Sequence, residues 1–280
     1  MKMNRSLAAL ALLTLAFVSV SYAGQNDQKR PMTFMDVMEM RAVASPDVSL
    51  DGERLLYTIS QPDWQAGKRF TDIFMVSTRQ GLSSTRQLTS TKDKNQSAPH
   101  WSRDGKFFAF LSDRDAPKGS ETENQLYVMR PDGGEARKVS DAKGGVESFA
   151  FSKDGKWLAF SAGKAEDRQI WAVPVSGVWS EMPVRWTKHS TPIESWQFSP
   201  DSQRIFFLSP DAFDRNNVKR KEEKFGVTIR NEPMPAIHLW AFDIESRSEA
   251  RQTSSPDYSV SNVTISDDSQ WIGFRGTPNN

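Results

Sequence analysis

One short pattern occurs five times along this 280-residue chain and limits the folds that are open to it. Each copy consists of an apolar residue, Ser, any residue, Asp, and then Gly or Ser, and the copies occupy residues 48–52, 101–105, 151–155, 198–202 and 265–269. The aspartates stand at positions 51, 104, 154, 201 and 268, so the first three intervals are 53, 50 and 47 residues and share nearly one period. Self-similarity at such a period indicates a repeat architecture.

Each copy joins two segments that are typical of β-strands. An alternating segment such as 149–151 precedes the copy, and a dense apolar run such as 107–111 follows it. Asp-Gly between apolar segments predicts a tight hairpin, because Gly adopts positive φ freely and Asp hydrogen-bonds the turn backbone. Two further β segments recur in the repeats, for example at 126–129 and 137–140, and the fourth segment of the fourth repeat is expected at 251–253.

This order of segments predicts an all-β fold, a β-propeller built of four-stranded antiparallel blades that is TolB-like or WD-repeat-like. One small sheet buries both of its faces only when neighbouring sheets stack on it. We expect about four and a half blades, at about 44–90, 97–140, 146–188, 193–254 and, as a partial blade, 259–280. A β-sandwich is the alternative fold, but it would not repeat the same four-element order.

Four and a half blades do not close a ring, and an open ring exposes apolar faces and strand edges. We therefore expect the chain to be the front part of a longer protein, unless the leader at 24–43 or a partner covers the open end. The leader contains a capping-box pattern at Thr33 and Asp36, which predicts a short helix that reaches about Ala42.

The first 23 residues have the features of a secretory signal peptide. Lys2 and Arg5 precede 14 apolar residues at 7–20, and small residues stand at Ser21 and Ala23. We expect cleavage after Ala23 and a periplasmic or secreted protein. A membrane anchor is the alternative, but a spanning helix needs roughly 20 apolar residues.

The charge balance and the absence of cysteine exclude several functions. With 36 Lys and Arg against 35 Asp and Glu, the net charge of +1 provides no general attraction to nucleic acids or acidic membranes. Without cysteine there is no disulfide, thiolate nucleophile, iron–sulfur cluster or Cys-ligated zinc. No cofactor is predicted.

Motifs that carry catalysis are missing from the sequence. The Gly-x-Ser-x-Gly elbow of α/β-hydrolases does not occur, and its nearest approximation, residues 159–163, is expected at the end of a blade strand. His100, His189 and His238 are far apart and are interpreted as ordinary loop or strand-edge histidines. The repeated aspartates are explained by turn geometry. We therefore expect neither catalytic residues nor metal ligands in this chain.

The fourth repeat contains an insertion of about 16 residues. From Asp201 to Leu239 the chain takes 38 steps, whereas it takes 22 from Asp104 to Leu126. Insertions on a rigid scaffold often contain binding groups. Glu222 and Glu223 lie in this insertion and could bind an ammonium group through charge-assisted hydrogen bonds, which makes them candidate substrate-binding residues.

The chain resembles the N-terminal propeller of prolyl oligopeptidase family serine peptidases, in particular the bacterial acylaminoacyl-peptidase and dipeptidyl-peptidase branch. The resemblance rests on the secretory leader, the helix at 32–36, the Ser-x-Asp-Gly blades and endings such as 272–276, and it covers residues 32–280. It implies a C-terminal α/β-hydrolase domain that supplies the catalytic Ser, Asp and His, and peptides as substrates. In some dipeptidyl peptidases of the family, paired glutamates on a propeller insertion hold the substrate amine, which Glu222 and Glu223 match in position but not in their flanking lysines.

The resemblance therefore implies a module that limits access and orients substrates in a secreted or periplasmic serine peptidase. Two other functions stay open. The first is a non-catalytic TolB-like scaffold that binds proteins of the cell envelope, since the TolB propeller has very similar blade motifs. The second is a propeller glycosidase or lyase, which would require carboxylates that converge on the central channel.

Overall fold

The computed structural model describes residues 30–117, 123–212, 223 and 235–278. The chain divides into two compact units, Met1–Met38 and Glu39–Asn280. The predicted signal peptide, 1–23, lies outside the described residues. In the first unit, helix α1 (Phe34–Met38) is closed at its start by the predicted capping box: the Asp36 N–H donates to Thr33 Oγ1 (3.3 Å) and the Thr33 N–H donates to Asp36 Oδ2 (2.7 Å).

Helix α1 is shorter than the sequence predicts. It ends at Met38, whereas the capping pattern predicted helix to about Ala42. Residues 42–48 form strand β1, where Ala42 pairs with Ser60 and Val43 with Ile59. The backbone groups of this segment are therefore used in a sheet and not in a helix.

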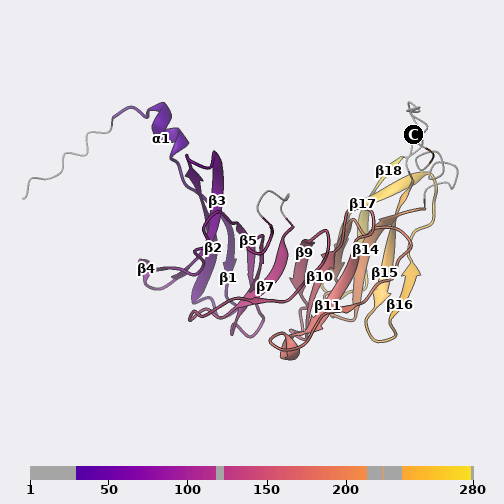
Figure 1. Cartoon of the computed structure of the whole chain (residues 1–280). Helices are drawn as coiled ribbons and strands as arrows, with labels where there is room; N and C mark the ends of the chain where they lie inside the picture. The colour runs from indigo at the N-terminus through magenta and orange to yellow at the C-terminus, as the bar shows by residue number, and fades with distance from the viewer. Residues whose placement is uncertain (1–29, 118–122, 213–222, 224–234, 279–280) are drawn as a thin grey trace, which may run out of the picture. The chain divides into compact units, whose positions relative to one another are not determined.

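The second unit consists of four four-stranded sheets and one two-stranded sheet, all antiparallel and each formed by consecutive strands (Figure 1). Blade 1 contains β1 (Ala42–Val48), β2 (Arg54–Asp63), β3 (Lys68–Ser77) and β4 (Gly81–Gln87). Blade 2 contains β5 (Gln96–Trp101), β6 (Phe108–Ser112), β7 (Gln125–Met129) and β8 (Arg137–Lys138). Blade 3 contains β9 (Val146–Phe151), β10 (Trp157–Ala162), β11 (Gln169–Pro174) and β12 (Val184–Arg185), with the short 3₁₀ helix η1 (Val175–Gly177) between the last two. Blade 4 contains β13 (Ser195–Phe198), β14 (Arg204–Pro210), β15 (Ile237–Asp243) and β16 (Ser248–Arg251), and blade 5 contains β17 (Tyr258–Ile265) and β18 (Ile272–Pro278).

The core lies between consecutive blades, which explains why the second strand of each repeat is a continuous apolar run. In β6, Phe108 and Phe110 pack on blade 1, whereas Ala109 and Leu111 pack on blade 3. In β14, Phe207 packs on blade 3 while its neighbour Phe206 packs toward blade 5. A strand that points alternate side chains into two buried interfaces requires apolar residues at every position.

The fivefold pattern forms the turn between the first two strands of every blade, as predicted. In each turn the Ser hydroxyl donates to the Asp carboxylate at 2.5–2.7 Å, and the N–H two residues after the Asp donates to the same oxygen at 2.9–3.1 Å. The last position has a φ of 60–73° in all five copies. Gly52, Gly105 and Gly155 adopt this φ without strain, whereas Ser202 and Ser269 adopt it as L-residues.

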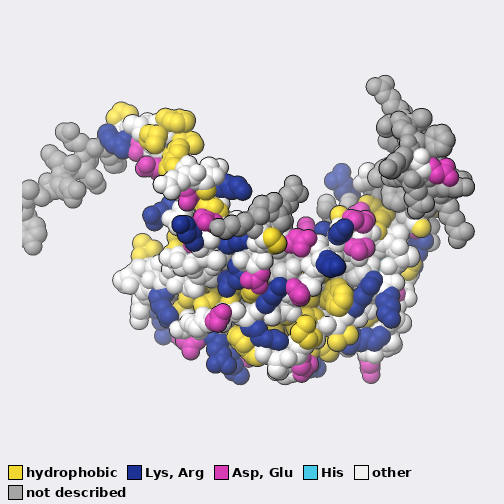
Figure 2. Space-filling view, in the orientation of Figure 1, with side chains coloured by type: hydrophobic (Ala, Val, Ile, Leu, Met, Phe, Trp, Pro, Cys, Tyr) yellow, Lys and Arg dark blue, Asp and Glu magenta, His cyan; other side chains and the backbone are white. Residues whose placement is uncertain are grey.

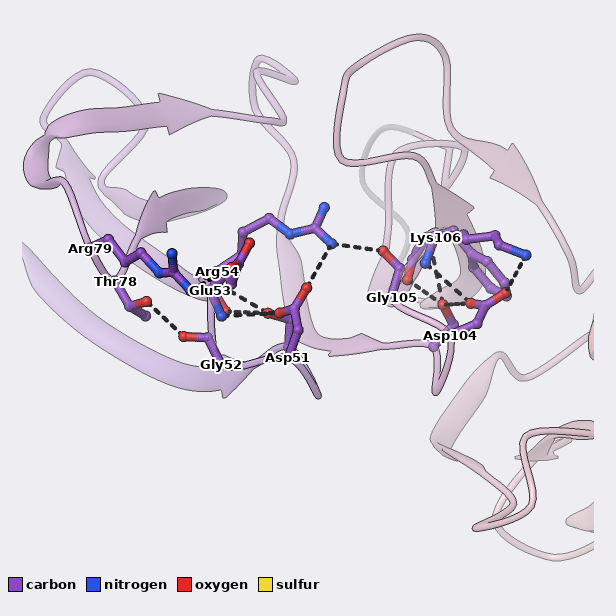
Figure 3. Close-up of polar contacts among 12 residues, drawn as sticks. Asp51, Gly52, Glu53, Arg54, Thr78, Arg79, Asp104, Gly105 and Lys106 are labelled. Carbon is purple, nitrogen blue, oxygen red and sulfur yellow. Dashed lines mark hydrogen bonds and ion pairs between the residues drawn. The ribbon is translucent and has the colours of Figure 1, made fainter.

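The corner turns also connect neighbouring blades. Ser202 Oγ accepts a hydrogen bond from the Asp154 N–H (3.0 Å), and Ser269 Oγ accepts one from the Asp201 N–H (3.0 Å). Each of these serines thus combines a left-handed backbone with a bond to the turn of the preceding blade. Between blades 1 and 2 a different contact serves, in which Arg54 Nη2 donates to the Gly105 carbonyl at 3.1 Å (Figure 3).

A second repeated feature ends the outer strand of each blade. In blades 1 to 4 a hydroxyl just beyond that strand accepts a hydrogen bond of 2.9–3.0 Å from an N–H of the third strand, and these hydroxyls belong to Thr89, Ser140, Thr187 and Thr253. In blade 4 the outer strand is β16 at Ser248–Arg251 and not the predicted 251–253. The prediction was displaced because Thr253 is the capping hydroxyl and lies outside the strand.

The corner aspartates should make the fold sensitive to acid. Hydrogen bonds from the Ser49 hydroxyl and the Glu53 N–H hold the pKa of Asp51 below its ordinary value, and Ser266 and the Gln270 N–H do the same for the pKa of Asp268. A carboxyl whose pKa is lower in the folded state than in the unfolded state stabilises the fold above the unfolded value of about 3.9, and this stabilisation is lost as the pH falls through the folded value.

We therefore expect the urea midpoint to fall when the pH is lowered from about 6 to about 2. The double variant D51N/D268N keeps both acceptor oxygens but does not titrate, so its midpoint should change less over the same range. An identical pH profile for the two proteins would show that these carboxylates do not contribute to the acid sensitivity.

Candidate functional site

The insertion in the fourth blade marks the candidate site. Strand β14 ends at Pro210 and β15 begins at Ile237, so the insertion occupies 211–236. In an antiparallel blade the connection between the second and third strands lies at the opposite end from the corner turn. We call these two ends of the blades the insertion edge and the corner edge. The first strand of each blade also begins at the insertion edge.

Both ends of the insertion are held together by a polar cluster that we call the neck, formed by Asp211, His238, Arg251 and Thr253. The Asp211 N–H donates to the Ala236 carbonyl at 2.9 Å. The Asp211 carboxylate lies 3.2 Å from Arg251 Nη2 and 3.3 Å from His238 Nε2. Thr253, the capping hydroxyl of blade 4, lies 3.3 Å from His238 Nδ1. The neck fixes the points at which the insertion leaves and rejoins blade 4.

His238 is the centre of the neck and its side chain is fully buried. Burial lowers the pKa of His238 and the positive charge of Arg251 lowers it further, while Asp211 opposes both effects. The imidazole is therefore neutral at neutral pH, and its Nε2 atom is buried and not aligned for a hydrogen bond with Asp211. His238 had been interpreted as an ordinary loop or strand-edge histidine; instead it is a buried residue of β15, a difference that only the packing of blade 4 reveals.

The two predicted substrate-binding residues are only partly covered by the structure. Glu223 is an exposed turn residue, and Glu222 lies outside the described residues. Their pairing therefore stays a prediction. The neck was not predicted as a unit, although Thr253 stands at the same repeat position as Thr89, Ser140 and Thr187.

The histidines and the candidate serine occupy separate places. His100 Nδ1 lies 3.4 Å from Asp47, and His189 Nδ1 lies 2.8 Å from Glu249. Ser161, the centre of the nearest hydrolase-like motif, is buried in β10 and shares a hydrogen bond of 2.9 Å with Ser148. No group of three or more metal-ligating side chains occurs within 30–117, 123–212, 223 and 235–278.

The same described ranges contain no helix that is both long and apolar enough to cross a membrane. Figure 2 shows positive and negative side chains interspersed over the visible surface, as the near-neutral net charge predicts.

Several curated proteins are similar to this chain in sequence. The uncharacterized peptidase YuxL of Bacillus subtilis is 31% identical over 142 residues, which cover 51% of this chain and 20% of that protein. Dipeptidyl-peptidase 5 of Porphyromonas endodontalis is 29% identical over 184 residues, covering 61% and 25%. A TolB homolog of Chlorobium luteolum is 30% identical over 126 residues, covering 45% and 25%. The chain thus spans a fifth to a quarter of the length of these relatives.

Solved structures are similar to the chain in fold. The β-propeller domain of the trilobed protease from Pyrococcus furiosus aligns with a TM-score of 0.53 at 12% identity, covering 80% of this chain and 60% of that one. An oligogalacturonate lyase aligns with a TM-score of 0.57 at 15% identity, covering 84% and 63%. No protein-family profile matches the chain. The repeated sheets, their shared interfaces and these neighbours together identify the chain as a β-propeller of four-stranded antiparallel blades that is related in sequence to peptidases.

Proposed function

We propose that this chain is the propeller portion of a secreted or periplasmic serine peptidase of the prolyl oligopeptidase family, and that it limits access to the active site and orients peptide substrates. The observation that carries the proposal is sequence similarity to proteins named as peptidases over 51–61% of the chain. The propeller fold agrees with such a role. The charged 1–5 segment and the 14 apolar residues that follow it support export.

In this proposal the chemistry is acyl transfer by a serine in an α/β-hydrolase domain of the same protein. The described part of this chain holds no grouping of nucleophile, base and oxyanion donors. Its own residues act by position. The neck holds the ends of the insertion rigidly on blade 4, because Asp211 contacts both the backbone of Ala236 and the Arg251 guanidinium.

The proposal can be tested on the protein from its native cells. The polypeptide that an antibody against residues 44–280 isolates should react with a fluorophosphonate and hydrolyse peptides, whereas residues 24–280 expressed alone should do neither. An unreactive native protein without peptide hydrolysis would refute the proposed function. Stoichiometric labelling of residues 24–280 would refute the claim that the nucleophile lies elsewhere.

Glu222 and Glu223 are proposed to bind the free amine of the substrate. A carboxylate pair binds an ammonium group through charge-assisted hydrogen bonds, and a neutral amide pair binds it less strongly. In the whole protein, E222Q/E223Q should raise KM about tenfold or more for substrates with a free N-terminus, since hydrogen bonds to charged groups contribute about 1.5–3 kcal/mol.

Two controls make this expectation specific. The same substrates with an acetylated N-terminus should show an unchanged KM in E222Q/E223Q. The variant E245Q, at an exposed glutamate of the corner edge, should leave KM unchanged for both substrate sets. Equal KM values for the wild type and E222Q/E223Q with free N-termini would exclude the glutamates from substrate binding.

A non-catalytic TolB-like scaffold is the second candidate function. It is favoured by the 30% identity to the TolB homolog over 45% of the chain. The fluorophosphonate experiment separates the two, because a scaffold predicts an unreactive native protein that co-purifies with envelope proteins.

A further inference from the structure

The corner edge carries a groove of about 1010 Å³ that extends across blades 1 to 3. Four cationic side chains line it: Arg54 from blade 1, Lys106 and Arg130 from blade 2, and Lys156 from blade 3. The carboxylates in the lining are Asp104 and Asp132. The groove therefore has two more positive than negative side chains, although the whole protein is nearly neutral.

The cations differ in how far they are already neutralised. Lys106 Nζ lies 3.5 Å from Asp104 and Lys156 Nζ lies 3.4 Å from Asp154, and both are exposed surface pairs of small energetic value. Arg130 is exposed, and among the described residues its contact is the ring of Trp179, 5.2 Å from the guanidinium carbon, with no carboxylate paired to it. Arg130 and Lys156 are thus available to an external anion.

The aromatic side chains of the groove are held in place by the protein itself. Trp179 packs edge-on against Phe107 (5.8 Å between ring centroids) in addition to Arg130. Trp157 packs edge-on against Trp186 at 5.0 Å and has Arg247 5.7 Å from its ring centre. Because these indoles already engage both an aromatic ring and a guanidinium, flat stacking of a sugar ring is disfavoured. Their exposed parts instead provide apolar surface for small side chains.

The size of the groove also restricts the ligand. A volume of about 1000 Å³ is at the upper end of the range for ligand sites, and a single inorganic anion fills a small part of it. The cations come from three successive blades, so they suit a ligand with several negative charges distributed along its length. An extended peptide provides such charges together with apolar side chains.

We propose that this groove binds an acidic segment of a polypeptide, with Arg130 and Lys156 as the principal contacts to its carboxylates. The site lies at the corner edge, and the proposal is independent of the peptidase function, which concerns the insertion edge. Complementary charge at exposed side chains contributes mainly to specificity and to the rate of association. Binding should therefore weaken as the salt concentration rises.

The test uses a fluorescein-labelled hexaglutamate peptide as the probe and fluorescence anisotropy of the whole chain at low salt. We expect saturable binding that R130E/K156E weakens tenfold or more. The matched control K68E/K92E reverses the charge of two exposed lysines at the insertion edge and should change Kd less than twofold. Lys156→Gln alone leaves the Arg130–Trp179 contact intact and should weaken binding severalfold, which keeps the test informative if the double variant does not fold.

Three results would overturn the proposal. The first is the absence of saturable hexaglutamate binding. The second is equal weakening by R130E/K156E and K68E/K92E, which would indicate attraction by net charge alone. The third is tighter binding of a hexagalacturonate, which has the same number of carboxylates, since it would assign the groove to an acidic saccharide.

Discussion

Replacing Phe207 by Ala is expected to lower the free energy of unfolding by about 3–5 kcal/mol. Phe207 is 1% exposed and lies in the middle of β14, where it packs into the interface between blades 3 and 4 with Ile170 and Phe242. Its ring also stacks on Trp240, with 6.4 Å between the ring centroids. The smaller side chain would leave a cavity that two rigid sheets cannot close.

Urea unfolding followed by tryptophan fluorescence measures this effect. Phe207→Leu retains most of the apolar volume and should cost clearly less than Phe207→Ala. Trp271→Ala removes a larger ring that is 74% exposed and should change stability by no more than about 0.5 kcal/mol. Equal losses for Phe207→Ala and Trp271→Ala would contradict the assignment of the core to the interfaces between blades.

Ser152→Ala is expected to destabilise the protein by about 1–3 kcal/mol, although it removes a single oxygen atom. The Ser152 side chain is fully buried, and its hydroxyl donates to Asp154 at 2.6 Å and accepts the Trp157 N–H at 2.9 Å. Without it, the Trp157 N–H loses a partner where water has little access. This unmet donor is the main cost.

The comparison variant is Ser176→Ala, which removes an exposed hydroxyl in η1 and should be neutral. Both variants can be measured by thermal and urea unfolding under the same conditions. If Ser152→Ala were as stable as Ser176→Ala, the corner hydrogen bonds would be a consequence of the turn and not one of its causes.

The features that could be predicted from the sequence depend on residues close together in the chain. The corner turns require only Ser, Asp and Gly within five positions, and the helix start requires only Thr33 and Asp36. The alternation of Phe206 and Phe207 between two interfaces follows from the two-residue period of a strand. Such local patterns were sufficient for the fold class and for the order of the blades.

The features that could not be predicted depend on residues that meet only in the folded protein. Ser202 was predicted as a turn residue, but its bond to the Asp154 N–H joins positions 48 residues apart. The neck brings Asp211 to Arg251 across 40 residues. The groove combines side chains from three blades, so no short pattern in the sequence indicates it.

The hydroxyls of Ser202 and Ser269 have a consequence for protein engineering. Since each is bonded to the turn of the preceding repeat, the fourth and fifth repeats are each adapted to a specific predecessor. Shuffling single repeats between homologous chains would separate a donor from its acceptor at these two junctions. Recombination should therefore use breakpoints that transfer adjacent repeats together, or introduce glycine at 202 and 269 so that each repeat becomes interchangeable.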